Sequence, residues 1–492
     1  MTILMIVELL VVLVALWIGA RYGSLALGAI SGIGLAVLVF GFQMKPGEPP
    51  TDVIYIIIAA VTCAGMLQAS GGMDWMIQIA ERMLRKHPER ITILAPFTTF
   101  FLTMLVGTGH VVYTLMPIIC DIALKKGIRP ERPCAIASIA SQIGITCSPI
   151  AAAVVAFSAI STENGFAVSN VQILLVTIPA CVIGILMAVA VSWHRGLDLD
   201  KDPKFLAKLK DPAQRDYIYG NTATTLDKKI APESKRAVYI FLIALVVIVV
   251  ISICSMMGIN LLPSFDTVQI VKGGPDSVTL PDGTVETAKQ LAKAGVVVAG
   301  VTHVVSKPLA MNLLIQITMI AAAALMIIFC KAKAKTAVSG AVWQNGMVAV
   351  VAIYGIAWMS DTYFSNYESE IQVLLCDLVK AYPWTIALAF FFVSVLINSQ
   401  GAVVAAMLPL AYTLDIDGWI LLGVMPSVYG YFFIPNYPSD IATVNFDRSG
   451  TTVIGKYLLN HSFMLPGMVH VVVASIAGLA ISYVYHFILG IY

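Results

Sequence analysis

Residues 91–124 read ITILAPFTTFFLTMLVGTGHVVYTLMPIICDIAL, an apolar run of about thirty residues. This run is too long for one ordinary membrane span, which needs roughly 20 residues. Gly107-Thr108-Gly109-His110 interrupts it near the middle, and Lys and Arg cluster on both sides of it. Basic loops favour the cytoplasmic face. We therefore expect a re-entrant helical hairpin. Its tip is a candidate binding site, because non-helical backbone at membrane depth survives only inside protein or along a wet cavity.

The composition is that of a membrane protein. Of the 492 residues, 59% are hydrophobic and 12% are charged, whereas soluble domains carry about 25% charged residues. A net charge of +2 gives no reason to expect nucleic-acid binding. The eight cysteines are scattered without metal or redox spacing, so we expect no disulfide framework, metal or cofactor. The apolar N-terminus, without a basic leader or an obvious cleavage site, is interpreted as a true first span.

Hydropathy predicts an all-α, polytopic membrane protein with about ten full spans and two re-entrant hairpins. The spans are expected at 3–20, 23–42, 53–70, 134–158, 171–193, 237–258, 309–330, 338–362, 418–446 and 465–488, and the hairpins at 91–124 and 384–416. Residues 259–307 form a polar insert that predicts a small β-hairpin around Pro281-Asp-Gly, then a short helix to about residue 294. Residues 363–383 are expected to form an amphipathic interfacial helix.

The placement of charge predicts the orientation. With both termini outside the cytoplasm and the full spans alternating, 24 of the 30 Lys and Arg residues fall on the cytoplasmic side. Residues 194–236 then form a cytoplasmic linker, and the insert 259–307 lies outside. No Lys or Arg lies inside an assigned span. The predicted location is the inner membrane of a cell.

The two halves of the chain, 1–193 and 237–492, predict an inverted repeat around the linker. Gly109 and Pro117 in the first hairpin are eight residues apart, and so are Gly401 and Pro409 in the second. A span broken by Pro and small polar residues follows each hairpin, over 134–158 and over 418–446. The charge pattern opens the first hairpin toward the cytoplasm and the second toward the outside. Inverted repeats with discontinuous helices at matching positions indicate a transporter site.

The chain breaks supply the candidate substrate-binding residues, because they place hydroxyl, amide and glycine groups in the middle of apolar segments. These residues are Gly107, Thr108, Gly109, Thr146, Ser148, Ser399, Gln400, Gly401, Asn436 and Tyr437. The alternative is that Ser, Thr and Asn cap the local backbone there, as they commonly do. Three further residues are candidates for a proton or charge role: His110, Asp361 and Arg448. For each, the alternative is an ordinary packing, span-end or topology-anchoring role.

Several motifs resemble those of a known family, the anaerobic four-carbon dicarboxylate uptake (Dcu) transporters of bacteria. The motifs span nearly the whole chain and include Ser70-Gly-Gly-Met-Asp74, Gly107-Thr-Gly109, Ser141-Gln142, Thr146-Cys-Ser-Pro-Ile150, Ala357-Trp-Met-Ser-Asp-Thr362, Ser399-Gln400, Ile434-Pro-Asn-Tyr-Pro438 and Ser449-Gly-Thr-Thr452. The family usually has Thr where this chain has Asn436. It also has an Arg directly after the paired Thr, whereas this chain has Val453 there and an Arg five residues earlier, at Arg448.

The resemblance implies transport of fumarate, succinate, malate or aspartate by exchange or proton-linked uptake. It also implies membership of the ion-transporter superfamily, whose solved relatives are dimers with elevator-type alternating access. A small organic anion, the lipid bilayer and a second copy of the chain are therefore the expected partners. The alternatives are a carrier of another organic anion or an amino acid, a membrane-embedded enzyme, or a sensor partner that docks through the linker. No Walker A pattern or catalytic constellation is present, so we expect a secondary transporter and not an enzyme.

Overall fold

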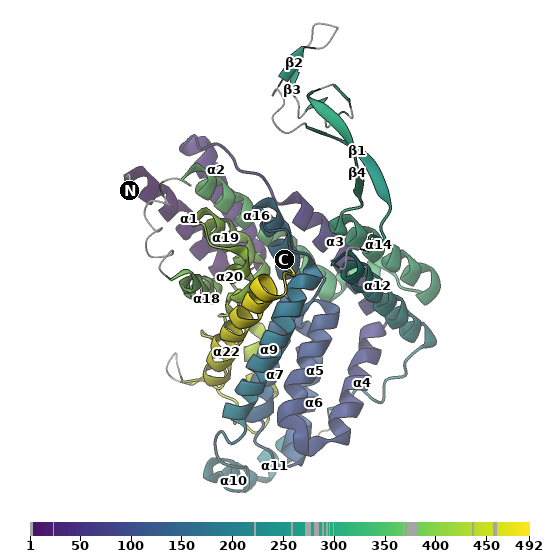
Figure 1. Cartoon of the computed structure of the whole chain (residues 1–492). Helices are drawn as coiled ribbons and strands as arrows, with labels where there is room; N and C mark the ends of the chain where they lie inside the picture. The colour runs from purple at the N-terminus through teal and green to yellow at the C-terminus, as the bar shows by residue number, and fades with distance from the viewer. Residues whose placement is uncertain are drawn as a thin grey trace.

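Helices make up most of the regular structure (Figure 1). The computed structural model describes residues 3–492 except 23, 221–222, 257–258, 271–276, 280–284, 288–289, 292–293, 295, 299, 368–369, 371–381, 435–436 and 456–459. Among the described residues, seven helices are long and apolar enough to cross a membrane, or eight if the pair Val53–Ala69 and Gly72–Lys86, bent by 72°, is one span. An all-helical membrane-spanning architecture is therefore confirmed, and the count of ten full spans stays a prediction.

Ten helical elements flank the two hairpins and their broken spans. They are α1 (Ile3–Tyr22), α2 (Ser24–Ala36), α3 (Thr51–Ala69), α4 (Gly72–Lys86), α9 (Asn170–Ser192), α12 (Pro232–Met256), α14 (Met311–Cys330), α15 (Ala334–Ser339), α16 (Ala341–Asn366) and α22 (Met464–Tyr483). Short π-helical turns extend α2 over Val37–Gly41 and α22 over Val484–Ile488. The sequence predicted a span over 53–70 but did not predict α4. This helix bends away from α3 by 72° at Gly71, which has a left-handed conformation with φ 76°.

The first predicted hairpin is a pair of helices with a break at its tip. After the 3₁₀ turn Pro88–Arg90, α5 (Ile91–Val106) leads to the tip, and η3 (Gly109–Val111) opens the returning helix α6 (Val112–Lys125). The broken span follows as α7 (Glu131–Ile143), the 3₁₀ turn η4 (Gly144–Cys147) and α8 (Ala152–Glu163). The helical breaks thus lie where the Gly-Thr-Gly and Thr-Cys-Ser-Pro patterns predicted them.

The second hairpin repeats this plan. A 3₁₀ turn (Pro383–Thr385) precedes α18 (Ile386–Leu396), and after the tip the chain returns as α19 (Gln400–Thr413). The second broken span consists of α20 (Gly418–Gly423), the 3₁₀ turn η6 (Met425–Val428), a connecting segment and α21 (Pro438–Phe446). This break is longer than the first, because residues 429–437 separate η6 from α21.

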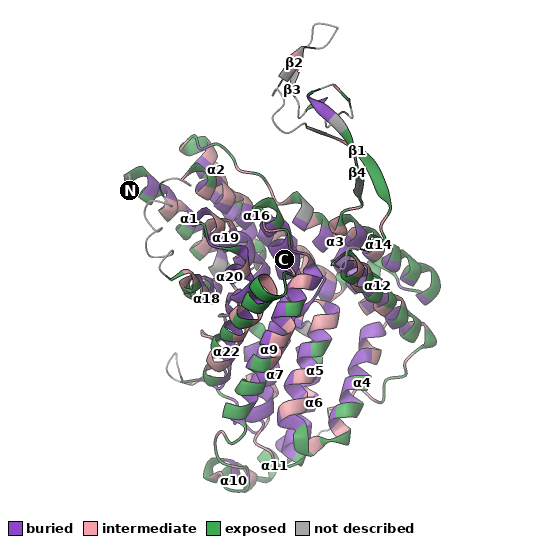
Figure 2. Ribbon diagram, in the orientation of Figure 1, coloured by how far each residue is buried: buried purple, intermediate pink, exposed green. Residues whose placement is uncertain are grey.

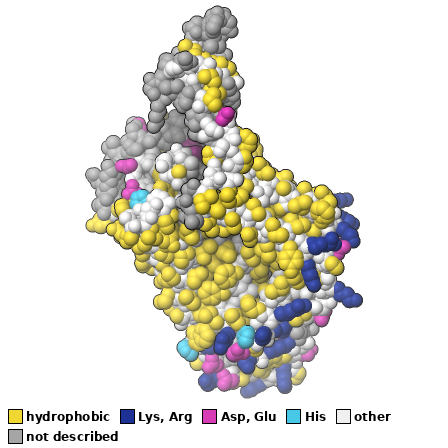
Figure 3. Space-filling view, turned by 45° about the vertical axis from the view of Figure 1, so that its right-hand side comes forward, with side chains coloured by type: hydrophobic (Ala, Val, Ile, Leu, Met, Phe, Trp, Pro, Cys, Tyr) yellow, Lys and Arg dark blue, Asp and Glu magenta, His cyan; other side chains and the backbone are white. Residues whose placement is uncertain are grey.

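The segments assigned to opposite sides gather at opposite ends of the molecule. Figure 1 shows the strands of the insert at one end and the linker helices α10 (Pro203–Leu209) and α11 (Pro212–Tyr219) at the other. Figure 3 shows Lys and Arg gathered at the end away from the strands, with a hydrophobic band between the two ends. Figure 2 shows exposed residues along the outer helices α12 and α22, where Ile243 and Ile476 are 62% and 64% exposed. These apolar exposed faces are suited to contact with lipid.

Ion pairs fasten the linker to the first hairpin and the broken span. Arg129 Nη1 lies 2.8 Å from Asp202 Oδ2, and Arg132 Nη1 lies 2.9 Å from Asp198 Oδ1. The hydrogen bond and positive charge of Arg132 hold the pKa of Asp198 below its ordinary value. Further along the linker, the backbone carbonyl of Thr225 accepts a hydrogen bond of 2.7 Å from Gln78 on α4. The linker therefore contacts both the hairpin region and α4.

The insert contains more β-structure than the sequence predicted. The expected hairpin is present as β2 (Ser277–Thr279) paired with β3 (Val285–Thr287), and its Pro-Asp-Gly turn lies outside the described residues. A second antiparallel pair joins β1 (Ser264–Ile270) to β4 (Thr302–Pro308), with Ser264 opposite Pro308. The sequence did not show this pairing, because the partners are some thirty residues apart and no turn signal links them. Part of the short helix predicted after the hairpin lies outside the described residues, although residues 290, 291 and 294 are helical, and most of the expected interfacial helix lies outside them as well.

The predicted orientation can be tested with single cysteines at the two ends of the molecule. Asp266→Cys on exposed β1 should react with a membrane-impermeant maleimide on intact cells, in a chain whose native cysteines are replaced by alanine. Lys210→Cys in the exposed linker should react only after the membrane is permeabilised. Labelling of Lys210→Cys but not Asp266→Cys on intact cells would reverse the assigned sides.

Candidate functional site

A cavity of about 390 Å³ lies where the two hairpin tips meet α3 and α16. Its lining comprises Ile57, Ala60, Val61, Ala64, Val106, Gly107, Thr108, Gly109, Tyr113, Ile145, Ile150, Ala152, Ala153, Val342, Asn345, Gly346, Val348, Ala349, Ala352, Asn398, Ser399, Gln400, Gly401, Tyr431, Tyr437 and Pro438. Among these described lining residues there is no Lys, Arg, Asp, Glu or His. The cavity is therefore polar through hydroxyl, amide and backbone groups and not through charged side chains.

Four helix N-termini reach this cavity. The first residues of α8, α19 and α21 line it, and Gly109 at the start of η3 leads into α6. No side chain caps the N-terminus of α8 or of α21. The first N–H groups of a helix have no partner within the helix, and the helix dipole places partial positive charge there. The cavity can thus attract an anion without a cationic side chain.

The tip of the first hairpin depends on its glycines. Gly107 ends α5 in the left-handed conformation, with φ 80°, and its N–H donates to the carbonyl of Thr103. A Cβ atom at Gly109 would lie 2.5 Å from Nε2 of Gln142 on α7. A larger residue at position 109 would therefore displace Gln142.

The tip of the second hairpin abuts the first broken span. Ser399 caps α19, since its Oγ accepts a hydrogen bond of 3.4 Å from the N–H of Ala402. A Cβ atom at Gly401 would lie 3.1 Å from the Cβ atom of Ala152, so the N-termini of α8 and α19 come close together. The side-chain oxygens of Asn398 and Gln400 are buried without a hydrogen-bond partner. These oxygens are acceptors that a bound ligand or water can satisfy.

Gln142 joins the breaks to one another, and sequence reasoning did not select it as a site residue. Its backbone carbonyl accepts a hydrogen bond of 2.9 Å from Nε2 of Gln400, and its Oε1 accepts one of 3.3 Å from the hydroxyl of Tyr431. Its Nε2 lies 3.4 Å from the hydroxyl of Ser439 on α21. The signal that could have found Gln142 was the Ser-Gln pair at 141–142, which is repeated in Ser399-Gln400.

The other predicted binding residues lie at different places relative to the cavity. The hydroxyl of Thr146 donates a hydrogen bond of 2.9 Å to the backbone carbonyl of Ile143 at the end of α7. This contact agrees with the alternative interpretation that Thr146 caps the local backbone. Ser148 is fully buried, its Oγ has no hydrogen-bond partner, and that Oγ lies 3.5 Å from where a Cβ at Gly107 would stand. Tyr437 lines the cavity, whereas Asn436 lies outside the described residues.

The three candidates for a proton or charge role are not among the described residues that line the cavity. The side chain of His110 is not described. Asp361 accepts a hydrogen bond of 2.9 Å from the backbone N–H of Glu48 and lines a second cavity. Arg448 pairs with the buried Asp121 on α6 at 3.0 Å, and its charge role stays a prediction.

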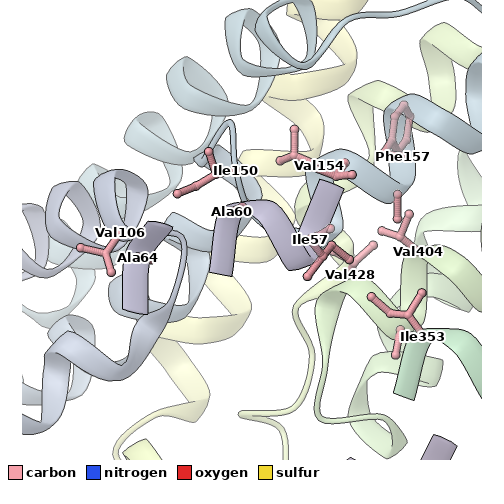
Figure 4. Close-up of a cluster of buried hydrophobic side chains, with 14 of the residues drawn as sticks. Ile57, Ala60, Ala64, Val106, Ile150, Val154, Phe157, Ile353, Val404 and Val428 are labelled. Atoms are coloured by element: carbon pink, nitrogen blue, oxygen red, sulfur yellow. The ribbon is translucent and has the colours of Figure 1, made fainter. Parts of the chain in front are cut away.

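An apolar seam separates the two cavities. The second cavity, of about 520 Å³, is lined by Thr51 on α3 and by residues such as Glu163, Asp361 and Pro409 on α8, α16 and α19. Between the two linings along these helices lie buried apolar side chains, which Figure 4 shows pointing toward one another. They are Val154, Phe157, Ile353 and Val404, and Ile57 of the central-cavity lining packs at their edge. The central cavity extends the other way, toward Val342 at the start of α16, which is the end assigned to the cytoplasm.

Comparison with known proteins agrees with this architecture. The family model described as "anaerobic c4-dicarboxylate membrane transporter" matches residues 4–486. The chain is 43% identical over 485 residues to the anaerobic C4-dicarboxylate transporter DcuB of Escherichia coli O6:H1, covering 98% of this chain and 99% of that protein. It is 32% identical to the C4-dicarboxylate transporter DcuA of Escherichia coli K12, over 99% of both chains. Neither relative is an enzyme by its description.

A solved structure shares the fold at low sequence identity. The Alcanivorax borkumensis YdaH transporter, whose structure "reveals an unusual topology", superposes with a TM-score of 0.53 at 14% identity, over 94% of this chain and 98% of that one. The match to the family model over nearly the whole length, together with the two long relatives, shows that this chain belongs to the anaerobic C4-dicarboxylate membrane transporter family.

Proposed function

We propose that this chain is a secondary transporter that carries four-carbon dicarboxylates, such as fumarate, succinate, malate or aspartate, across the bacterial inner membrane. The observation that supports this most is the central cavity, where four helix N-termini converge and where the described lining has no charged side chain. The family membership and the names of the relatives agree with this substrate class. Transport would proceed by antiport or by ion-coupled uptake.

The helix N-termini form two groups that suit the two carboxylates of one substrate. One group is α8 with α19, which approach each other at Ala152 and Gly401. The other group is η3–α6 with α21. The side-chain amide of Gln142 lies between these two N-termini, because it packs against Gly109 in η3 and lies 3.4 Å from the hydroxyl of Ser439 in α21. Each group would offer backbone N–H groups and partial positive charge to one carboxylate. Hydroxyl and amide groups at Thr108, Ser399 and Gln400 would add directional hydrogen bonds.

Alternating access would be of the elevator type. We infer that the two hairpins and the two broken spans move as one unit against a scaffold of α1–α3, α12, α14 and α16, through which the chain forms a homodimer. The apolar seam is suited to sliding, because it makes no hydrogen bonds that have to break. In this conformation the seam would close the central cavity toward the end assigned to the outside, and the cavity extends toward Val342, at the end assigned to the cytoplasm.

The transport proposal is tested with purified protein in liposomes. Labelled succinate or aspartate should accumulate only when counter-substrate is present inside or an ion gradient is imposed. Uptake equal to that of empty vesicles, across a panel of organic anions and amino acids, would refute the transporter proposal. Uptake confined to another anion or an amino acid would keep the transporter and correct the substrate.

Substrate binding should depend on the tips and not on Arg448. Losing a hydrogen bond to a charged group costs about 1.5–3 kcal/mol, so Ser399→Ala and Thr108→Val should each raise Kd roughly tenfold to over a hundredfold. Arg448→Gln is the control, because Arg448 pairs with Asp121 outside the cavity lining. A titration on detergent-purified variants, with thermal unfolding of each, measures both effects. Unchanged affinity in the tip variants, with binding abolished in Arg448→Gln, would show that a cationic side chain recognises the substrate.

The elevator proposal predicts crosslinking across the seam that depends on substrate. Ile353 on α16 and Val404 on α19 both belong to the seam, so the pair Ile353→Cys and Val404→Cys should crosslink in this conformation and less when substrate shifts the moving unit. The native pair Cys120 and Cys134, with sulfur atoms 3.0 Å apart on α6 and α7, lies inside the moving unit and serves as the control. Equal crosslinking of the seam pair in all substrate states would mean that the hairpins do not move.

A further inference from the structure

Asp440 is a buried acid next to the central cavity, within the predicted broken span 418–446. It lies in the first turn of α21, two residues after Pro438, which lines the cavity. The residue is 1% exposed, and its Oδ1 accepts a hydrogen bond of 2.7 Å from the hydroxyl of Ser138 on α7. An acid at such a depth is costly to keep, and such acids commonly have a functional role.

No cationic side chain neutralises Asp440 among the described residues: it takes part in none of the ion pairs that the described part of the chain forms. α6 and α7 pack against α21, and their charged residues lie toward the helix ends remote from the cavity, where Arg132 pairs with Asp198 and Lys125 with Asp121. The titratable side chains that face Asp440 among the described residues are the phenols of Tyr113, Tyr429, Tyr431 and Tyr437. Burying an ionised carboxylate without a cation nearby costs free energy, so burial favours the protonated, neutral form of Asp440.

Hydrogen bonds link Asp440 through Gln142 to the second hairpin tip, and the side chain of Gln142 packs against the first. The hydroxyl of Ser138 lies 3.2 Å from that of Ser439, which in turn lies 3.4 Å from Nε2 of Gln142. Gln142 contacts Gly109 in the first tip and Gln400 in the second. A change in the charge of Asp440 is therefore transmitted to the wall that would hold the substrate.

The sign of the coupling follows from electrostatics. When Asp440 is ionised, its negative charge lies within the N-terminal turn of α21 and cancels the positive end of that helix dipole. The same charge repels a carboxylate in the cavity, and the repulsion is strong where the local dielectric constant is low. Proton binding at Asp440 removes both effects, so proton and dicarboxylate each increase the affinity for the other.

We propose that Asp440 is the proton-coupling site of this transporter: its carboxylate binds one proton as the dicarboxylate binds, and both cross the membrane in the same direction. The proposal rests on the proposed transport function and adds to it the residue that takes up the coupled proton. The chemistry is reversible protonation of a carboxylate to a carboxylic acid, with the proton taken from the aqueous side to which the cavity is open. Ser138 is a positioning residue, since its hydroxyl holds the carboxyl group in place.

The test compares Asp440→Asn with Asp415→Asn in proteoliposomes. Asparagine keeps the size of the side chain and can still accept the hydrogen bond from Ser138, but it cannot take up a proton in this pH range. Asp415 is a matched control, because it is an exposed turn residue with φ 60°, a conformation that Asn tolerates well. Two quantities are measured for labelled succinate: exchange against internal succinate, and uptake driven by an imposed inward proton gradient.

In the wild type and in Asp415→Asn, the gradient should drive accumulation, and binding affinity in detergent should fall as pH rises from about 6.5 to 8.5, a range in which succinate itself stays largely ionised. In Asp440→Asn, the ratio of gradient-driven uptake to exchange should fall at least tenfold, and affinity should no longer depend on pH. Gradient-driven uptake with the wild-type ratio and pH profile in Asp440→Asn would overturn the proposal.

A second variant keeps the test decisive if Asp440→Asn does not fold. Ser138→Ala removes a hydrogen bond that favours the ionised carboxylate, so the pH profile of binding should shift to higher pH. An unshifted profile would count against Asp440. Wild-type exchange without any response to a proton gradient would also overturn this inference while leaving the proposed transport function intact, whereas the absence of dicarboxylate exchange in the wild type would refute the transport function itself.

Discussion

Inside a bilayer, no water is available to the polypeptide backbone, so each N–H and C=O group needs a partner within the protein or in a ligand. Most of this chain meets that constraint with long apolar helices. At four places it does not, because the helices break in the middle of apolar segments. All four breaks lie around one cavity, where the unpaired N–H groups can donate hydrogen bonds to a bound anion. The location of the candidate site thus follows from backbone hydrogen bonding.

The breaks can meet only because small residues and amides fill the space between them. Gly109 leaves room for the amide of Gln142, and Gly401 allows α19 to approach α8 at Ala152. Gln142 then makes hydrogen bonds to the second hairpin and to the segment before α21. A larger residue at either glycine would separate the helix N-termini and weaken the field that they create together. Close packing and anion recognition therefore depend on the same residues.

The distribution of charge complements this design. Basic side chains gather at one end of the molecule, where Arg129, Arg132 and Arg448 pair with acids of the linker and of α6 (Figure 3). These pairs hold the linker and the hairpin base together, and at the buried Asp121 the arginine offsets the cost of taking a carboxylate out of water. A cation inside the cavity would bind a dianion strongly but would also slow its release. Helix dipoles supply a weaker attraction, which suits a carrier that must let its substrate go.

The membrane class, the two helical hairpins, the positions of the breaks and the polar residues at the hairpin tips were predictable from the amino-acid sequence alone, because hydropathy, Gly and Pro are local signals. Seven of the ten predicted binding residues line the cavity, namely Gly107, Thr108, Gly109, Ser399, Gln400, Gly401 and Tyr437. The folded structure was needed to show that Gln142 joins the breaks, that Arg448 pairs with Asp121, that β1 pairs with β4 and that Asp440 lies buried with no cationic side chain beside it among the described residues. The physical reason is that these are contacts between residues far apart in the chain, and such contacts depend on how finished helices pack, which no local pattern of residues encodes.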